Sequence, residues 1–270
     1  MARFWSIILT SLTAFKQVYI NPINRGREPN ASEEEVRIAR ARSAELLRLT
    51  RPFILRRTSD ILEKYLPEKI ENVVFCSMSA LQHSMYEAYL RSSNIYNILN
   101  GNMSSALEAI AALRLLCNHP LHACKQVGEA IAGRPQYNNL KKEIEALASS
   151  EAFDVEASGK MLVLKSILSQ IRRTGNNRVV LVSLYKKTLD LLEKMCLQED
   201  FSFCRLDGST PQGRRQEIVD NFNQDNKTFL FLLSSKAGGV GLNLIGANVL
   251  IMVECDWNPA TDHQAMARGV

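Results

Sequence analysis

Apolar segments alternate with helical stretches in the second half of the chain, and this alternation constrains the fold more than any other feature. The apolar segments cover residues 178–184, 202–206, 228–234 and 248–253. Helical stretches begin near residues 159, 186, 211 and 260. Strands that are apolar on both faces and spaced by helices are typical of a parallel sheet covered by helices. The sequence therefore predicts an α/β lobe whose working loops leave the carboxyl ends of the strands.

Small and polar residues follow three of these apolar segments directly. They are Ser183 and Lys186 after the apolar residues 179–182 of the first segment, Gly208, Ser209 and Thr210 after the second, and Ser235, Lys236, Gly238 and Gly239 after the third. Glycines let the backbone approach a bulky anion, and lysine adds a point charge for phosphate. A single glycine-rich loop of this kind is better explained by a tight strand-to-helix turn without a ligand. Three of them at successive strand ends favour phosphate binding.

Two nucleotide-binding motifs are incomplete. Gly239 and Gly241 do not complete a dinucleotide fingerprint, because the third glycine position is Leu244. Residues 158–161 do not form a phosphate-binding loop, since Met161 stands where Ser or Thr would hold magnesium. Ser158 is instead predicted to cap the following helix.

Gln264 and Arg268 are four residues apart near the end of the chain. On a helix they share one face. An arginine held in this way can stabilise the charge that develops on a transferring phosphoryl group. A surface hydrogen-bonded pair explains the spacing equally well, so the spacing alone leaves both interpretations open.

Charge and cysteine usage limit the class of protein only broadly. The formal net charge of +5 fits a nucleic-acid partner without requiring one. The six cysteines contain no CxxC pair, which is typical of reduced thiols in an intracellular protein. Cys117, His119, His122 and Cys124 could be ligands of zinc, but a helix that ends before Pro120 explains this segment better. No metal site is predicted.

The first half of the chain is predicted to be mainly helical. Ser32 should cap a helix that begins with three glutamates. Further predictions are helices over residues 1–65, a strand over residues 70–77, two helices over residues 79–118, and a loop with a weak helix over residues 125–157. The second of the two helices carries four residues on one face, namely Leu107, Ile110, Leu113 and Leu116. The apolar run over residues 4–15 is too short to cross a membrane, and no membrane partner is expected.

Several blocks of the sequence resemble one known family. Residues 205–210, 235–244 and 256–268 resemble the second-lobe motifs of SWI/SNF-type helicase-like ATPases. The linking blocks of that family are similar to residues 53–58, 66–67 and 116–120. Residues 25–29 and 66–76 narrow the resemblance to the Rad-fifty-four-type DNA repair and recombination translocases. The resemblance runs in order over residues 12–268 and corresponds to a truncated C-terminal half of such a motor.

The resemblance implies a fold and a division of the chain. The fold would be α/β, with an incomplete RecA-like parallel sheet lobe, a helical insertion and a helical N-terminal segment. Residues 1–77 would be the helical tail and last strand of the first motor lobe. Residues 78–157 would be the helical insertion and linker, and residues 158–270 the helicase C-terminal lobe.

The resemblance also implies a function. Proteins of this type couple ATP hydrolysis to movement along double-stranded DNA in the nucleus, together with the recombinase filament of homologous recombination. The alternatives are a chromatin remodeller of the same superfamily and a non-catalytic module that binds DNA or the recombinase. ATP and Mg²⁺ would serve the complete motor. Because no stretch matches the Walker A lysine loop or the acidic magnesium box, the chain alone is predicted to bind neither tightly and to be inactive.

The roles of individual residues follow from the same resemblance. Those that should lie at the DNA backbone are Ser183, Lys186, Gly208, Ser209, Thr210, Ser235, Lys236, Gly238 and Gly239. Those that should face the nucleotide are Gly241, Asn243, Gln264 and Arg268, the last two in the catalytic role. Arg56 and Arg57 should lie near the junction of the lobes. The chain departs from the family at Glu254 and Cys255, where Asp-Pro is usual.

Overall fold

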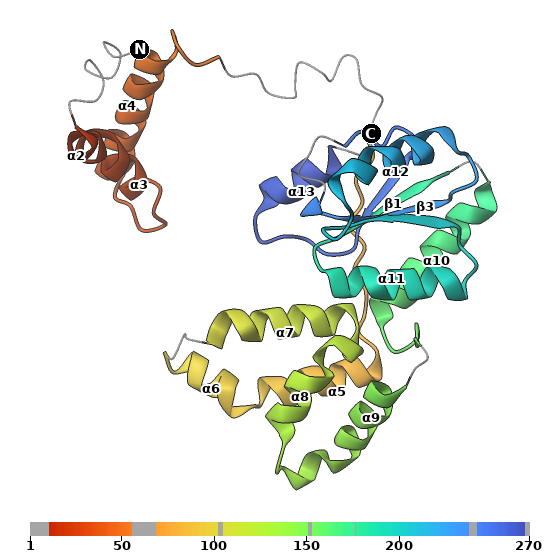
Figure 1. The fold of residues 1–270 in the computed structure, drawn as a ribbon. Helices are drawn as coiled ribbons and strands as arrows, with labels where there is room; N and C mark the ends of the chain where they lie inside the picture. The colour runs from red at the N-terminus through yellow and green to blue at the C-terminus, as the bar shows by residue number, and fades with distance from the viewer. Residues whose placement is uncertain are drawn as a thin grey trace. The chain divides into compact units, whose positions relative to one another are not determined.

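The computed structural model describes residues 11–55, 69–101, 105–150, 153–175, 177–237 and 242–267. The chain divides into two compact units, Met1–Val73 and Val74–Val270, which are described separately (Figure 1). Within the described ranges, no helix combines the length and the apolar character that crossing a membrane requires.

The first unit is helical where it is described. Its elements are α2 (Leu12–Phe15), the π-helical turn η1 (Lys16–Ile20), α3 (Asn21–Arg25) and α4 (Glu33–Thr50). The predicted cap of α4 is confirmed: the Ser32 hydroxyl accepts the Glu35 amide at 3.3 Å, and the Glu35 carboxylate accepts the Ser32 amide at 2.9 Å. Gly26 lets the end of α3 approach α4, because a Cβ at this position would overlap Ala39.

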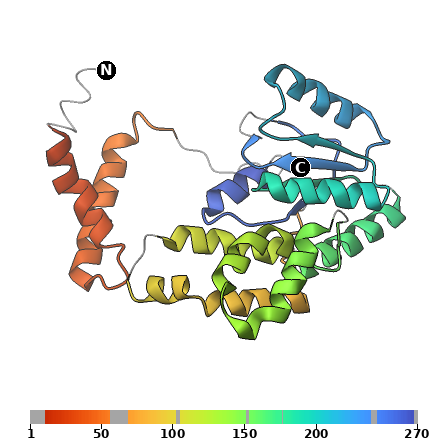
Figure 2. The same cartoon turned by 60° about the horizontal axis from the view of Figure 1, so that its bottom comes forward.

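The second unit begins with a helical module, defined here as residues 79–149. Its elements are α5 (Ala80–Leu90), α6 (Ser93–Leu99), α7 (Ala106–Asn118), η4 (Pro120–Ala123), α8 (Cys124–Ile131), η5 (Pro135–Tyr137) and α9 (Asn138–Ser149). Met85, Leu116, Val127 and Ile131 are at most 2% exposed and form the centre of its core. Figures 1 and 2 show this module as a body of its own beside the sheet.

The sheet lobe follows the helical module and alternates helices with strands. Its elements are α10 (Gly159–Thr174), β1 (Val179–Ser183), α11 (Lys186–Gln198), β2 (Phe203–Leu206), α12 (Gln212–Gln224), β3 (Leu230–Ser234), β4 (Val249–Met252) and α13 (Pro259–Met266). The strand order is β2-β3-β1-β4, and every pairing is parallel. The predicted α/β lobe with a parallel sheet is therefore confirmed.

Both faces of the sheet are buried, as the apolar segments predicted. Val179 and Leu181 of β1 point into a core that includes residues of α10 and α11. Val180 and Val182 point into a second core that includes residues of α12 and α13. Figure 1 shows these two pairs of helices on opposite sides of the sheet. All five residues of β1 and of β3 are buried, so the two central strands anchor the lobe.

Three predictions for the first half of the chain are wrong. Residues 69–79 form no strand, and Val73 and Phe75 are 81% and 93% exposed, since no described strand pairs with this segment. Residues 79–118 form three helices, α5, α6 and α7, where two were predicted. Residues 125–157 contain α9 and most of α8, where a loop with one weak helix was predicted.

Only part of the predicted apolar face of α7 is buried. Leu116 is fully buried, but Leu107 is 82% exposed and Ile110 is 54% exposed. The helix instead buries Ala109 and Ala112. Small side chains on a helix allow a neighbouring helix to approach closely, and α7 uses them to pack within the helical module.

Candidate functional site

The three predicted phosphate loops leave the same edge of the sheet. Ser183 at the end of β1 lies opposite Ser234 at the end of β3, and Leu206 at the end of β2 lies opposite Leu233. The Ser235 amide donates to the Ser183 carbonyl at 3.0 Å, which joins the first and third loops. The parallel register therefore gathers polar groups that lie far apart in the sequence.

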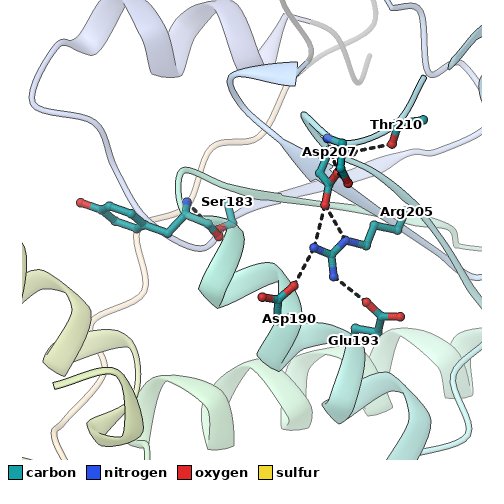
Figure 3. A network of polar contacts seen from close by, with 8 residues as sticks. Ser183, Asp190, Glu193, Arg205, Asp207 and Thr210 are labelled. Atoms are coloured by element: carbon teal, nitrogen blue, oxygen red, sulfur yellow. Dashed lines mark hydrogen bonds and ion pairs between the residues drawn. The ribbon is translucent and has the colours of Figure 1, made fainter. Parts of the chain in front are cut away.

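The second loop is anchored by the guanidinium of Arg205, whose side chain is 18% exposed (Figure 3). Nε and Nη2 of Arg205 donate to Asp207 Oδ2 at 3.0 and 2.7 Å. Two further carboxylates on α11, those of Asp190 and Glu193, accept from Arg205 at 2.7 and 2.5 Å. Charge-assisted and bidentate bonds are the stronger hydrogen bonds in proteins, so Arg205 fixes Asp207 relative to α11.

Asp207 in turn fixes the backbone of its own loop. Its Oδ1 atom accepts the Ser209 amide at 2.8 Å and the Ser209 hydroxyl at 2.5 Å. Its amide donates to Thr210 Oγ1 at 3.1 Å. Burial opposes ionisation of Asp207, but the hydrogen bonds from Ser209 and Arg205 outweigh it and lower its pKa to about 2. The carboxylate is thus ionised at neutral pH and holds the loop closed.

These bonds decide which groups of the loop remain able to donate to an anion. The Ser209 hydroxyl proton is directed at Asp207. The Thr210 hydroxyl accepts a bond, and its own proton has no acceptor within the described residues. Gly208 is an exposed residue, and its amide likewise has no acceptor within those residues. The loop therefore offers the Gly208 amide and the Thr210 hydroxyl as donors.

Ser183 lies beneath the surface of the first loop. Its side chain is 1% exposed, its hydroxyl contacts the Tyr185 carbonyl and Glu254 Oε1, both at 3.1 Å, and it accepts the Tyr185 amide at 3.2 Å. Figure 3 shows Ser183 close to the start of α11. Lys186, the first residue of α11, is exposed. The first loop can therefore present Lys186 to a ligand, whereas Ser183 orders the loop.

The third loop has the same division between a buried hydroxyl and an exposed lysine. Ser235 is 9% exposed, and its Oγ atom has no hydrogen-bond partner within the described residues. Lys236 is exposed. Gly238 and Gly239, predicted for the same loop, lie outside the described residues.

Arg215 of α12 connects the second and third loops and was not predicted. Its Nε atom donates to the Thr210 carbonyl at 3.0 Å, and its Nη1 atom donates to the Ala237 carbonyl at 3.3 Å. Both acceptors are backbone atoms, which leave no signature in the sequence. An arginine one turn after the Pro211 helix start was the one available signal. Arg215 places a half-buried positive charge behind the two loops.

Two of the predicted nucleotide-facing residues lie on described parts of the chain. Asn243 and Gln264 are exposed, and neither side chain makes a hydrogen bond within the described residues. The helix α13 that carries Gln264 begins at the Asn258 cap, and the Asp262 carboxylate accepts the Asp256 amide at 3.0 Å. Gly241, Arg268, Arg56 and Arg57 lie outside the described residues.

The cysteine and histidine cluster is a helix end, as predicted. His119 is fully buried, its Nε2 atom contacts the Asp154 carbonyl at 2.9 Å, and its Nδ1 atom accepts the Leu121 amide at 3.2 Å. The Cys124 thiol donates to the Pro120 carbonyl at 3.4 Å. Across the described ranges, no group of three or more His, Cys, Asp or Glu residues is arranged to hold a metal ion.

The segment that fails as a phosphate loop also has a structural role. The Ser158 hydroxyl accepts the Met161 amide at 3.3 Å, so the predicted cap of α10 is confirmed. The Gly159 amide donates to Gln82 of α5, and a Cβ at Gly159 would overlap the Ser77 carbonyl. This glycine therefore serves a close approach of backbone rather than a ligand.

Two family models match the chain. Residues 5–122 match the SNF2-related domain, and residues 159–270 match the helicase conserved C-terminal domain. Together they cover the first unit from residue 5, the helical module as far as residue 122, and the sheet lobe.

Named relatives and a solved structure agree with these matches. The chain is 45% identical over 97% of its length to the DNA repair and recombination protein RAD54B of Gallus gallus, and 43% identical over 97% of its length to the DNA repair and recombination protein RAD54-like of Homo sapiens. It spans 30% and 35% of the lengths of these two relatives. The C-terminal part of the Fun30 ATPase domain superposes with a TM-score of 0.59 at 28% identity, covering 76% of this chain and 81% of that one.

Proposed function

This chain belongs to the SNF2 family of helicase-like ATPases and is homologous to Rad54-type proteins, and from this premise we propose that it forms part of an ATP-driven motor on double-stranded DNA. The motor would act in DNA repair and recombination, which the names of its relatives state, and more specifically in homologous recombination in the nucleus. Residues 158–270 would be the second motor lobe, residues 78–157 the helical insertion and linker, and residues 1–77 the tail of the first lobe. A filament of RecA-like recombinase would be its protein partner.

The observation that carries this proposal is the gathering of three loops at one edge of the parallel sheet. Lys186, Lys236, the Thr210 hydroxyl and the Gly208 amide are all donors, and Arg215 adds positive charge behind them. Such groups contact phosphates and position a protein on DNA without reading its bases. A translocase needs contacts of this kind, because it must bind every sequence that it passes. Ser183, Ser209 and Ser235 would shape these loops rather than touch the phosphates.

The nucleotide would lie at Asn243 and Gln264, together with Gly241 and Arg268. The two described amides fit a polar ligand, since both are exposed and without hydrogen bonds in the described ranges. In the complete motor, ATP would supply the phosphoryl transfer that drives movement. Mg²⁺ would be held there by the carboxylates of the acidic box, a motif that this sequence does not match. We therefore expect the pure chain to release no phosphate from ATP, with or without duplex DNA. Turnover that Arg268→Ala abolishes would contradict this expectation.

The DNA proposal is tested by binding to labelled duplexes of several sequences across a salt series. With about three to five phosphates engaged, log affinity should fall against log salt with a slope of about −3 to −4. Lys236→Ala should reduce that slope by about one and weaken binding to all sequences alike. Lys227→Ala is the matched control, because Lys227 is an exposed lysine that precedes β3, at the opposite edge of the sheet.

Two results would overturn the proposal. Strong preference for one duplex sequence would indicate a specific binding module instead of a motor lobe. An equal effect of Lys227→Ala and Lys236→Ala would indicate nonspecific attraction by net charge rather than binding at the strand ends.

A further inference from the structure

The side chain of Asn118, at the last residue of α7, is 1% exposed and lies between the helical module and the sheet lobe. Its Nδ2 atom donates to Glu254 Oε1 at 2.6 Å and to Thr188 Oγ1 at 3.3 Å. Its Oδ1 atom accepts from Lys160 Nζ at 2.6 Å. Its carbonyl accepts the Ser158 hydroxyl at 2.6 Å. One buried residue thus joins the end of α7 to α10, to α11 and to the segment after β4.

An amide suits this position because it accepts and donates at the same time. Lys160 brings an ammonium group, which can only donate, and Glu254 brings a carboxylate, which can only accept when ionised. The amide of Asn118 connects the two, so that a half-buried cation and a buried anion are satisfied through one side chain. Glu254 is 7% exposed, and burial raises its pKa while hydrogen bonds to the carboxylate act in the opposite direction. Removing one member would leave a charge buried without its partner, which is strongly unfavourable.

The carboxylate of Glu254 extends these contacts to the first phosphate loop. Its Oε1 atom accepts the Ser183 hydroxyl and its Oε2 atom accepts the Leu184 amide, both at 3.1 Å. Lys186 follows two residues after Leu184, so Glu254 holds the backbone that presents this lysine. Lys160 also donates to the carbonyl of Val253 at 3.1 Å, which fixes the chain just before Glu254.

The same carboxylate lies at the start of the segment that leads to Gln264. Two residues after Glu254, the Asp256 amide donates to the Asp262 carboxylate on α13. The chain from Glu254 to Gln264 is therefore fixed at both ends. Glu254 contacts the proposed DNA side at Leu184, and it precedes the segment that leads to the proposed nucleotide side.

We propose that Asn118, Lys160 and Glu254 form a positioning centre that holds the loop at residues 183–186 and the segment at residues 254–264 in register with the helical module. The inference rests on the proposed function, because the two segments carry the proposed DNA and nucleotide contacts. These three residues touch neither ligand and act through the loops that they hold. These contacts give a role to Glu254, which the sequence motifs left without one.

The first test is amide hydrogen exchange in the full chain, which requires no ligand. Glu254→Gln replaces one acceptor oxygen by an NH₂ donor, so the Leu184 amide or Asn118 Nδ2 loses its acceptor. Exchange at residues 183–186 and 254–258 should become about tenfold faster, while β3 and α5 are unchanged. Glu199→Gln is the matched control, since Glu199 pairs with Lys165 at 2.6 Å at the other end of α11.

Glu254→Asp keeps the charge and shortens the side chain, and it serves if Glu254→Gln does not fold. It should give the same pattern of faster exchange to a smaller extent. Faster exchange throughout the sheet lobe, or no change at residues 183–186 with either variant, would overturn the positioning centre.

The second test is a double-mutant cycle on duplex affinity, which separates positioning from loss of stability. Lys186→Ala should reduce the salt slope by about one in the unchanged chain and by less than half of that in Glu254→Gln. Lys236→Ala should keep more of its effect than Lys186→Ala in Glu254→Gln, because Glu254 makes no hydrogen bond to the third loop within the described residues. Equal, additive losses at both lysines would refute the coupling. No effect of either lysine in the unchanged chain would refute the proposed DNA contacts, and hydrogen exchange would still decide the positioning centre.

Discussion

Asp207→Asn removes the charge that closes the second loop while it preserves the size of the side chain. The Asp207 side chain is 6% exposed, so solvent screens its interactions little. Its pKa is about 2 in the folded chain, against an ordinary value of 3.8. At about 1.4 kcal/mol for each pKa unit, this difference corresponds to about 2 kcal/mol of folding stability at neutral pH.

The sign of the pH dependence follows from the direction of the shift. Because folding lowers the pKa of Asp207, its contribution is complete above pH 3.8 and is lost as the pH falls towards 2. Asp207→Asn should therefore destabilise the sheet lobe by about 2 kcal/mol at pH 7 and by about half of that at pH 3. Asp190→Asn is the matched control: it removes another carboxylate from Arg205, but Asp190 is 50% exposed and its ion pair should contribute less than about 1 kcal/mol.

Alkylation of Cys196 in a urea series measures the unfolding of the sheet lobe alone at pH 7, and hydrogen exchange at the buried strands β1 and β3 measures it at pH 3, where thiols do not react. Cys196 is fully buried in the core on the α10 and α11 side, and burial raises the pKa of its thiol to about 12, so it reacts only when the lobe unfolds. Equal losses for Asp207→Asn and Asp190→Asn would refute the reasoning. A loss for Asp207→Asn that is the same at pH 7 and pH 3 would also refute it.

Two further predictions concern the second loop and the cysteine and histidine cluster. Thr210→Ala should weaken duplex binding by about fivefold, whereas Ser209→Ala should change it less than about twofold, because only the Thr210 hydroxyl has a proton free to donate; the reverse order in a binding titration would contradict this. Metal analysis of the purified chain should find no stoichiometric zinc, because His119, His122, Cys117 and Cys124 belong to a helix end; about one zinc per chain, lost in Cys124→Ser, would contradict it.

The sheet lobe could be predicted because its signals are local. Residues 179–182 and 229–233 are apolar without a break, and such runs between helices have few structures other than a central parallel strand. The shared edge of the loops then follows from the parallel direction of the strands. Caps at Ser32 and Ser158 were predicted for the same reason, since each hydroxyl accepts an amide three residues ahead.

The helical module was harder to predict because contacts with segments far away in the sequence determine which face of each helix is buried. On α7, the stripe with Leu107 and Ile110 and the adjacent stripe with Ala109 and Ala112 are both apolar. The larger side chains indicated the first stripe, but close packing within the module buries the second. The strand predicted over residues 70–77 is absent for a related reason. The composition of these residues suits a strand, but a strand also needs a neighbouring strand to complete its hydrogen bonds.

Residues that connect distant segments could not be predicted at all. The side-chain partners of Asn118 lie 42, 70 and 136 residues away, and their amino acids carry no mark of the contact. Zinc binding and a helix end were the two interpretations of four residues in the sequence, Cys117, His119, His122 and Cys124. Neither interpretation gave a role to Asn118, which lies among them. That role follows from where α7 stops: the helix must end at Asn118 for its amide to reach Lys160 and Glu254. Asn118→Asp keeps an acceptor for Lys160 but places a second carboxylate beside Glu254, whereas Asn118→Ser removes the contacts to both. If the NH₂ donor of the amide is required, Asn118→Asp should speed hydrogen exchange at residues 183–186 more than Asn118→Ser does, because two adjacent buried carboxylates repel each other. The opposite result, with slower exchange at residues 183–186 in Asn118→Asp than in Asn118→Ser, would show that the Asn118 amide is not what joins the helical module to the sheet lobe.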